Sequence, residues 1–251
     1  MTTKGLTVRF SGRAVLNNVD MVLRKGETLA LMGLSGVGKS TTLRCLMGFQ
    51  HANEGDIHLF GQLIHSNGRE MIKGKDMDRL RRRIGMVFQQ PALFDSMTVG
   101  DNVAFGLREQ QHLSEEEILR RVAENLRIVD LEGLEHLYPS QMSGGMQKRA
   151  SIARAICTEP ELLLYDEPTT GLDPIISNVI NELILSLQRR LGASAIVVTH
   201  DLHSAYTIAT RIAFLYEGKI VEEGPPDQFQ KSTNPYVVQF REGNTHGPIK
   251  V

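Results

Sequence analysis

The chain has 251 residues, of which 41% are hydrophobic and 23% are charged, and its formal net charge at pH 7 is −1. This is an ordinary soluble globular composition, sufficient for one large hydrophobic core or two small ones. The near-zero net charge gives no global signal for a nucleic-acid partner. No apolar run approaches the roughly 18 residues that span a bilayer, and the first ten residues lack the apolar region of a signal peptide. Work at a membrane would therefore need another chain that spans it.

The first part of the chain predicts β-strands. Runs at 5–10 and 14–23 are strand-like, and 55–64 predicts a further strand pair or hairpin. We expect these strands to form an N-terminal antiparallel sheet. The two cysteines, Cys45 and Cys157, lie in apolar helical patterns, so we expect reduced core residues of a cytoplasmic protein.

A glycine-rich stretch lies between a buried strand at 27–33 and a helix at 40–48. Its spacing from Gly33 to Ser40 fits G-x-x-x-x-G-K-S, the phosphate-binding P-loop; the alternative is an ordinary strand-to-helix turn. Glycines let several N–H groups converge at a helix N-terminus, which suits phosphate. Lys39 would reach the β- and γ-phosphates, and the Ser40 hydroxyl would hold Mg²⁺. The remaining nucleotide contacts predicted here are Leu34, Ser35, Gly36, Val37, Gly38 and Thr41.

The middle of the chain changes from polar to helical. Residues 65–83 carry seven Lys or Arg against three Asp or Glu, which predicts a solvated loop and an exposed helix; a nucleic-acid patch would need interleaved aromatics. Residues 84–94 predict a buried strand that ends at a proline-marked loop. Helices follow from about 100 to 157, one of them starting with a capping box of Ser114 and Glu117.

Two short apolar runs, 161–168 and 193–200, are typical of strands buried on both faces of a parallel sheet. The helix between them has Asp173 as its predicted N-cap, Pro174 at its first position and Gly192 at its end. Strand–helix–strand repeats on both sides of a helical insert predict an α/β core with two additions.

Both apolar runs end in side chains that can bind a ligand or take part in catalysis. Asp166 and Glu167 end the first run, at the sheet edge where parallel sheets bind ligands. Asp166 would be linked to Mg²⁺, and Glu167 would orient or deprotonate the attacking water; a solvated strand end is the alternative. His200 ends the second run, where a γ-phosphate contact competes with a purely structural role.

These pieces, together with MSGGM at 142–146, resemble the ATP-binding cassette (ABC) ATPase family along nearly the whole chain. GLSGVGKS is similar to Walker A, VFQQPALF to the Q-loop, LLLYDE to Walker B and TTGLDP to the D-loop, with His200 as the switch histidine. The implied fold is a P-loop NTPase (RecA-like) α/β core with an N-terminal antiparallel β subdomain and an inserted α-helical subdomain. The implied division is a core at 1–90 and 158–231, a helical subdomain at 91–157 and a tail at 232–251.

The resemblance also implies residue roles. Phe10 matches the aromatic that stacks on adenine, although core packing would explain it equally. Gln89 would be a catalytic residue and a Mg²⁺ ligand, in the loop that the family uses to touch its membrane subunit. Ser143, Gly144 and Gly145 would contact ATP bound to a second copy, and Asp173 would join the nucleotide site. Met146 stands where the family usually has glutamine, so the details of closure are open.

The resemblance implies an ATPase that uses ATP and Mg²⁺ as a head-to-tail pair of copies, with no nucleic acid. A transporter motor is favoured over a soluble repair or translation ATPase, which carries inserts or tandem cassettes, and over a degenerate scaffold, because Lys39, Glu167 and His200 are all present. Residues 88–109 resemble MCE (Mla-type) phospholipid transporters, which implies an integral permease, an MCE-domain lipid-binding protein and a peripheral location on the cytoplasmic face of the inner membrane. A polar amino-acid or small-solute importer is the alternative.

The tail at 232–251 contains few apolar residues and cannot fold alone. We hypothesise that it packs on the partner ATPase subunit and helps the two copies to pair. A frayed terminus is the alternative.

Overall fold

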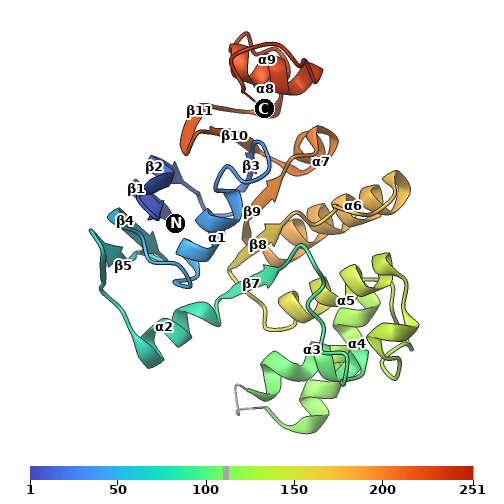
Figure 1. The fold of residues 1–251 in the computed structure, drawn as a ribbon. Helices are drawn as coiled ribbons and strands as arrows, with labels where there is room; N and C mark the ends of the chain where they lie inside the picture. Colours follow the sequence, from blue (N-terminus) through green and yellow to red (C-terminus); the bar gives the residue numbers. More distant parts are fainter. Residues whose placement is uncertain (110–112, 251) are drawn as a thin grey trace. The chain divides into compact units, whose positions relative to one another are not determined.

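The computed structural model describes residues 1–109 and 113–250 (Figure 1). It contains two compact units, unit 1 with Met1–Arg81 and Ser194–Val251, and unit 2 with Arg82–Ala193. The predictions for 110–112, inside the expected helical subdomain, and for residue 251 of the tail lie outside the described residues. The subdomain boundaries predicted at 91 and 157 both lie within unit 2, and the division by subdomain stays a prediction.

Unit 1 begins with the antiparallel sheet that the sequence predicts. Its strand order is β2–β1–β4–β5–β6. Leu6 and Val8 of β1 and Leu16 of β2 are fully buried. The strands are β1 (Thr2–Phe10), β2 (Arg13–Val22), β4 (Glu54–Leu59), β5 (Gln62–Ser66) and β6 (Arg69–Glu70). The two-residue β6 and the helix α2 (Gly74–Arg81) occupy the polar segment that predicted a loop and an exposed helix.

The second group of strands in unit 1 is mainly parallel. β3 (Thr28–Met32) pairs in parallel with β9 (Ser194–Thr199) on one side and with β10 (Arg211–Tyr216) on the other, and β11 (Lys219–Gly224) adds antiparallel to β10. All five residues of β3 are buried, as a central parallel strand requires. Two helices follow the parallel strands directly, α1 (Lys39–Leu46) after β3 and α7 (Leu202–Ile208) after β9.

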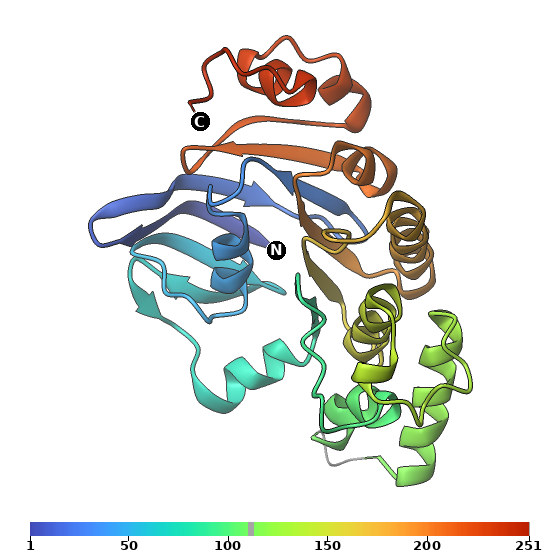
Figure 2. The ribbon, with the colours of Figure 1, turned by 45° about the vertical axis from the view of Figure 1, so that its right-hand side comes forward.

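The tail corrects an expectation. It forms α9 (Pro235–Glu242), which follows α8 (Pro226–Gln230), and Val237 and Ile249 join the core cluster around β10. Both views show α8, α9 and the strands β10 and β11 side by side (Figures 1 and 2). The frayed-terminus alternative is therefore wrong for the residues up to 250, because Val237 and Ile249 are buried and Tyr236 and Phe240 are partly buried against their own unit. Packing on a partner subunit stays a prediction.

Unit 2 combines a parallel strand pair with helices. β7 (Ile84–Val87) pairs with β8 (Leu162–Asp166), and α3 (Val99–Arg108), α4 (Glu115–Ile128) and α5 (Gly144–Ile156) pack against one another (Figure 2). The short 3₁₀ helix η1 (Pro139–Gln141) precedes α5. The long helix α6 (Pro174–Leu191) begins and ends as predicted, capped by the Asp173 carboxylate at one end and by Gly192 with a φ of 59° at the other.

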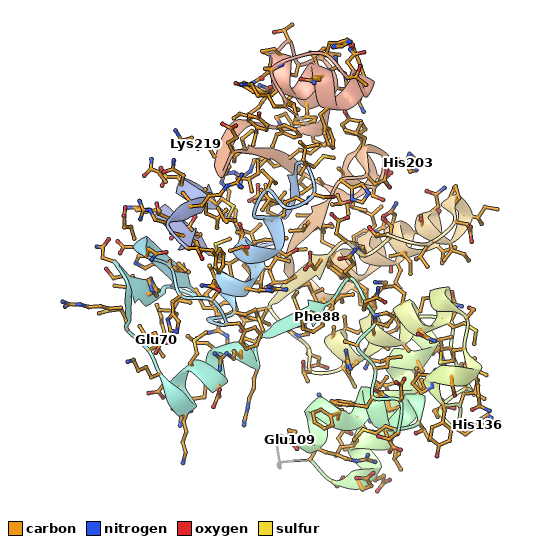
Figure 3. All side chains as sticks on the ribbon, in the orientation of Figure 1. Glu70, Phe88, Glu109, His136, His203 and Lys219 are labelled. Carbon is orange, nitrogen blue, oxygen red and sulfur yellow. The ribbon has the colours of Figure 1, made fainter. Side chains whose placement is uncertain are left out.

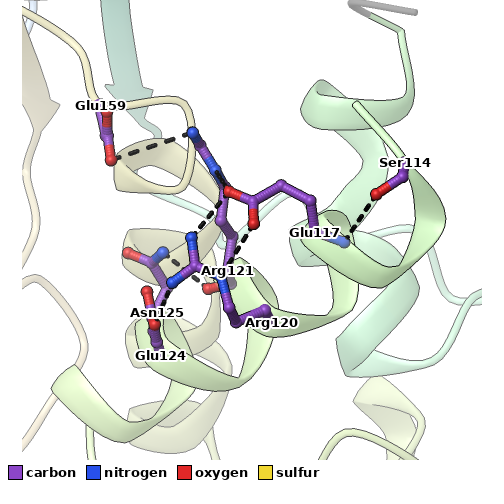
Figure 4. A network of polar contacts seen from close by, with 7 residues as sticks. All are labelled: Ser114, Glu117, Arg120, Arg121, Glu124, Asn125 and Glu159. Carbon is purple, nitrogen blue, oxygen red and sulfur yellow. Dashed lines mark hydrogen bonds and ion pairs between the residues drawn. The ribbon is translucent and has the colours of Figure 1, made fainter. Parts of the chain in front are cut away.

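The predicted capping box of α4 is only half formed. The Ser114 hydroxyl accepts a hydrogen bond from the Glu117 N–H at 3.2 Å, as expected. The Glu117 carboxylate, however, accepts hydrogen bonds from Arg120 and Arg121 instead of returning to Ser114 (Figure 4). With the two guanidinium groups both partners of each bond are ionised, and the single carboxylate bonds to two donors, which favours this arrangement.

These elements confirm an α/β fold of the P-loop NTPase type with an antiparallel β addition and helices. Both cysteines are buried and free, as predicted, and burial raises the pKa of each thiol to about 12. Among the residues described, no helix is both long and apolar enough to cross a membrane.

Candidate functional site

The loop between β3 and α1 has a backbone that only glycine fits at two points. Gly33 has a φ of 148°, and a Cβ there would lie 2.3 Å from the carbonyl oxygen of Leu215. Gly38 has a φ of 111°, and its Cβ would lie 2.9 Å from the carbonyl oxygen of Val15. The loop is therefore pressed against β10 and β2 of its own unit, and its shape is set by contacts that any side chain would break.

Lys39 lies along this loop and is only 5% exposed. Its ammonium donates to the carbonyl oxygens of Gly33 and Leu34, each at 2.9 Å. Helix α1 starts at Lys39 with no side-chain cap and no acidic residue in its first turn. Since the first N–H groups of a helix lack intrahelical partners, this end of α1 combines donors, dipole and cation, which fits a phosphate group.

A cavity of about 570 Å³ adjoins the P-loop within unit 1. This volume is in the range of small-ligand sites. It is lined by Arg13, Ala14, Val15, Leu34, Ser35, Gly36, Val37, Tyr216, Glu217, Gly218 and Lys250. The contributions of the β10–β11 turn and of the tail were not predicted, because no local pattern links these segments to the P-loop.

Phe10 and His200 also belong to unit 1. Phe10 ends β1 and is 45% exposed, so it is not a core residue, and adenine stacking stays a prediction. His200 is exposed directly after β9. Met32 of β3 pairs with Thr199 of β9. The P-loop and His200 therefore directly follow the carboxyl ends of two adjacent parallel strands.

In unit 2 the two carboxylates end β8. Glu167 is 8% exposed and has a φ of 49°, an uncommon conformation for a residue with a side chain. The Thr170 hydroxyl donates to its Oε2 at 3.0 Å and so orients the carboxylate. Val87 of β7 pairs with Tyr165 of β8, so Gln89 and Glu167 each follow two residues later at the same edge. Sequence reasoning missed Thr170, whose only signal is its spacing of three residues from Glu167.

The side chain of Gln89 is exposed, but its backbone carbonyl group is hydrogen-bonded to a buried side chain. Its carbonyl oxygen accepts a hydrogen bond from the ammonium of Lys148 at 2.7 Å. Lys148 is 2% exposed, and burial lowers its pKa to about 8, against the opposing attraction of Asp166. This lysine was also missed, because nothing local distinguishes it from a solvated helix residue.

The predicted signature residues start α5. Ser143 is its N-cap, with a hydroxyl that accepts from the N–H of Met146 at 3.3 Å, and both Ser143 and Gly144 are exposed. A Cβ at Gly145 would lie 2.9 Å from Cγ2 of Ile176, so glycine is required there for packing. Asp173 caps α6 through hydrogen bonds to two N–H groups, which gives it a structural role; its nucleotide role stays a prediction.

Each unit thus gathers part of the predicted site. Phe10, the P-loop and His200 lie in unit 1; Gln89, the signature residues, Asp166, Glu167 and Asp173 lie in unit 2. The described residues contain no group of three or more His, Cys, Asp or Glu that could hold a metal ion. Magnesium does not need such a cage, since it keeps several waters and takes one or two protein ligands plus phosphate oxygens. A hydroxyl such as that of Ser40 and a carboxylate such as that of Asp166 are therefore donor types that magnesium accepts.

A phosphate-binding loop whose backbone conformation requires glycine, together with two carboxylates at the end of a parallel strand, is the defining feature of a P-loop NTPase. The ABC transporter family model matches residues 16–170, and the chain belongs to this family. It is the ATP-hydrolysing subunit of an ABC transporter.

The chain is 38% identical to the intermembrane phospholipid transport system ATP-binding protein MlaF of Haemophilus influenzae, over 98% of this chain and 92% of that protein. It is also 38% identical to the spermidine/putrescine import ATP-binding protein PotA of Oleidesulfovibrio alaskensis, over 94% of this chain and 61% of that one. The dimeric ATP-binding cassette MJ0796 in a post-hydrolysis state bound to ADP and Pi superposes with a TM-score of 0.80 at 31% identity, covering 90% of this chain and 98% of that one.

Proposed function

We propose that this ATPase drives phospholipid transport between the membranes of a cell envelope. The observation that carries the substrate is the similarity to MlaF, which extends over nearly the full length of both chains. The match to PotA covers only 61% of that relative. MlaF therefore has little sequence beyond the part that this chain matches, whereas PotA has a further part without a counterpart here, which favours the lipid system.

ATP is proposed to bind to the P-loop of one copy and to the signature residues of a second copy. The exposed Ser143 and Gly144 at the N-terminus of α5 support this role, since a hydroxyl and helix N–H groups suit a phosphate. The dimeric state of MJ0796 with ADP and Pi supports a pair of copies. Ser40, Gln89 and Asp166 are the proposed ligands of Mg²⁺, which supplies charge neutralisation at the phosphates.

For hydrolysis, Glu167 is proposed to orient and deprotonate the attacking water. Its carboxylate is oriented by Thr170, and its burial keeps the base away from bulk solvent. Lys39 would leave the carbonyl oxygens of Gly33 and Leu34 to contact the β- and γ-phosphates, and His200 would contact the γ-phosphate. Phe10 would stack on adenine, and Asp173 would complete the nucleotide site between the copies.

The proposed assembly contains two copies of this chain, an integral permease and an MCE-domain lipid-binding protein. The chain would then lie on the cytoplasmic face of the inner membrane, as a peripheral subunit. The exposed Phe88, Phe94 and Phe105 of unit 2 support a contact with another protein, because they leave aromatic surface uncovered near the Gln89 loop.

The second candidate is an importer of small polar solutes. The similarity to PotA, at the same identity as to MlaF, supports it. It differs from the lipid proposal in its partner, which would be a permease that works with a solute-binding protein.

The test is to isolate the chain from native membranes in mild detergent and to identify every co-purifying protein and lipid. The expected result is an integral permease, an MCE-domain protein and bound phospholipid. A permease with a solute-binding protein and no enriched lipid would replace the lipid proposal by the importer. Untagged cells processed in parallel correct for lipid that detergent micelles carry along.

A further inference from the structure

The segment Phe88–Ala92 leaves β7 and follows an irregular path (Figure 3 labels Phe88). The ladder between β7 and β8 ends at Val87, so strand pairing does not support this segment. It nevertheless contains Gln89, which belongs to the proposed site. Its backbone carbonyls therefore need other donors if the position of Gln89 is to be defined.

Two cations of helix α5 supply these donors. The Lys148 ammonium donates to the carbonyl oxygens of Phe88 at 3.1 Å and of Gln89 at 2.7 Å. The Arg154 guanidinium donates to the carbonyl oxygens of Pro91 at 3.1 Å and of Ala92 at 2.7 Å. Four of the five carbonyls in the segment are thus held from one helix, and bonds to ionised donors are the stronger kind.

Without these hydrogen bonds, the burial of the two cations would lower the stability of the folded state. Lys148 is 2% exposed on a face of α5 that also buries Ile152 and Ala155, four and seven residues further on. Burial lowers the pKa of Lys148 and of Arg154, which reflects the cost of removing each charge from water. An apolar residue of similar volume would fill the same space without this cost. The cation at position 148 is therefore explained by its bonds to the segment and not by packing.

The helix that carries both cations also begins with the signature serine. Lys148 lies five residues after Ser143, which is about 7.5 Å along the helix axis. The negative charge of Asp166 also acts on Lys148, since it opposes the lowering of the Lys148 pKa by burial. One ammonium is thus bonded to the Gln89 backbone, carried by the signature helix and attracted by the Asp166 carboxylate.

We infer that Lys148 and Arg154 are positioning residues that fasten the Phe88–Ala92 segment to α5, so that Gln89 and Ser143 move together during the ATPase cycle. This inference rests on the proposed roles of Gln89 and Ser143 in ATP hydrolysis. The bonds of both cations go to the segment that contains Gln89, so we expect them to act on turnover and not on ATP affinity.

The test compares the full-length chain with Lys148→Met and Arg154→Met. Arg149→Met is the matched control, because Arg149 is one residue along α5 and its guanidinium also donates to two carbonyls, those of Val129 and Asp130, but not to the segment. Amide hydrogen exchange without nucleotide is measured first. We expect the amides of Phe88, Gln89, Gln90 and Ala92 to exchange about tenfold faster in both test variants and at the wild-type rate in the control, since Pro91 has no amide hydrogen.

ATP hydrolysis is then measured with MgATP as the only ligand. We expect kcat to fall about tenfold in Lys148→Met with KM changed by less than about threefold, and both constants to stay at wild-type values in Arg149→Met. Wild-type exchange at 88–92 in both test variants overturns the inference, as does faster exchange with wild-type kcat. If Lys148→Met does not fold, Arg154→Met tests the same segment from its other end.

A failure of the proposed function would look different. If Glu167→Gln hydrolysed ATP like the wild type, the assignment of the base would fail, while the exchange result at 88–92 would stand. If exchange is unchanged but Glu167→Gln is inactive, only the fastening by Lys148 and Arg154 fails.

Discussion

The two units hold the residues of the proposed site in different ways. In unit 1 the shape of the P-loop is enforced by sterics, since a side chain at Gly33 would collide with the backbone of β10. In unit 2 the groups are held by side chains: Thr170 orients Glu167, and Lys148 holds the Gln89 backbone. The comparison teaches that a loop whose shape depends on glycine can be predicted from the spacing of its glycines. A site whose residues are held by side chains distant in the sequence cannot be predicted in this way.

The largest effect is expected from a substitution that removes the proposed base of unit 2 and changes nothing in unit 1. Glu167→Gln should lower kcat by about 10³-fold because the amide cannot accept the proton of water, while ATP still binds. Phosphate release and nucleotide titration of the same preparation check both parts. Glu182→Gln, at an exposed position of α6, is the control. Wild-type hydrolysis in Glu167→Gln would refute the assignment.

The converse variant breaks unit 1. Lys39→Ala should weaken ATP binding by about 10- to 100-fold, because a charge-assisted contact to the phosphates is lost. Isothermal titration with MgATP measures it, and Lys25→Ala, at an exposed lysine in the turn before β3, should bind like the wild type. Unchanged affinity in Lys39→Ala would contradict the P-loop role.

The tail packs into the core of unit 1, so its contribution to the stability of that unit can be measured. Val237→Ala should lower the free energy of unfolding by about 2 kcal/mol, because Val237 is fully buried in the core around β10. Val238→Ala changes a neighbouring, partly exposed valine and should cost less. Urea unfolding distinguishes the two.

The same tail carries the hypothesis of pairing between copies. Deletion of 235–251, followed by measurement of dimer content and of unfolding, separates the roles. A lower unfolding free energy with unchanged dimer content would reject pairing through the tail.

A smaller effect is expected at the hydroxyl that orients the base. Thr170→Val removes the hydrogen bond to Glu167 and should lower kcat about tenfold with little change in KM. Thr170→Ser retains a hydroxyl and should recover most of the activity. Equal rates in the valine and serine variants would show that orientation by this hydroxyl is not needed.

A further effect concerns the pH dependence of stability. Burial lowers the pKa of Lys148 to about 8, so between that pH and its ordinary value near 10.5 the unfolded chain holds a proton that the folded chain has lost. The wild type should therefore gain stability relative to Lys148→Met as pH rises through this window, with the full unfavourable contribution present below pH 8. Unfolding of both proteins at pH 7 and pH 10 measures the change, and a constant difference would exclude a lowered pKa.

Sequence alone determined the local features of this protein. Gly33, Gly38, the strand ends at Asp166 and His200, and the cap of α6 could be predicted because each depends on neighbours within a few residues: a positive φ, an apolar run or a helix terminus without partners. The spacing of such features also suffices to predict the P-loop NTPase fold.

Only the tertiary structure decided the contacts between distant segments. Lys148 donates to carbonyl oxygens 59 and 60 positions away, and the tail packs on β10. These contacts depend on which side chains are buried together when the chain is compact. Burial is a sum of many weak long-range contacts, and no short stretch of sequence encodes it.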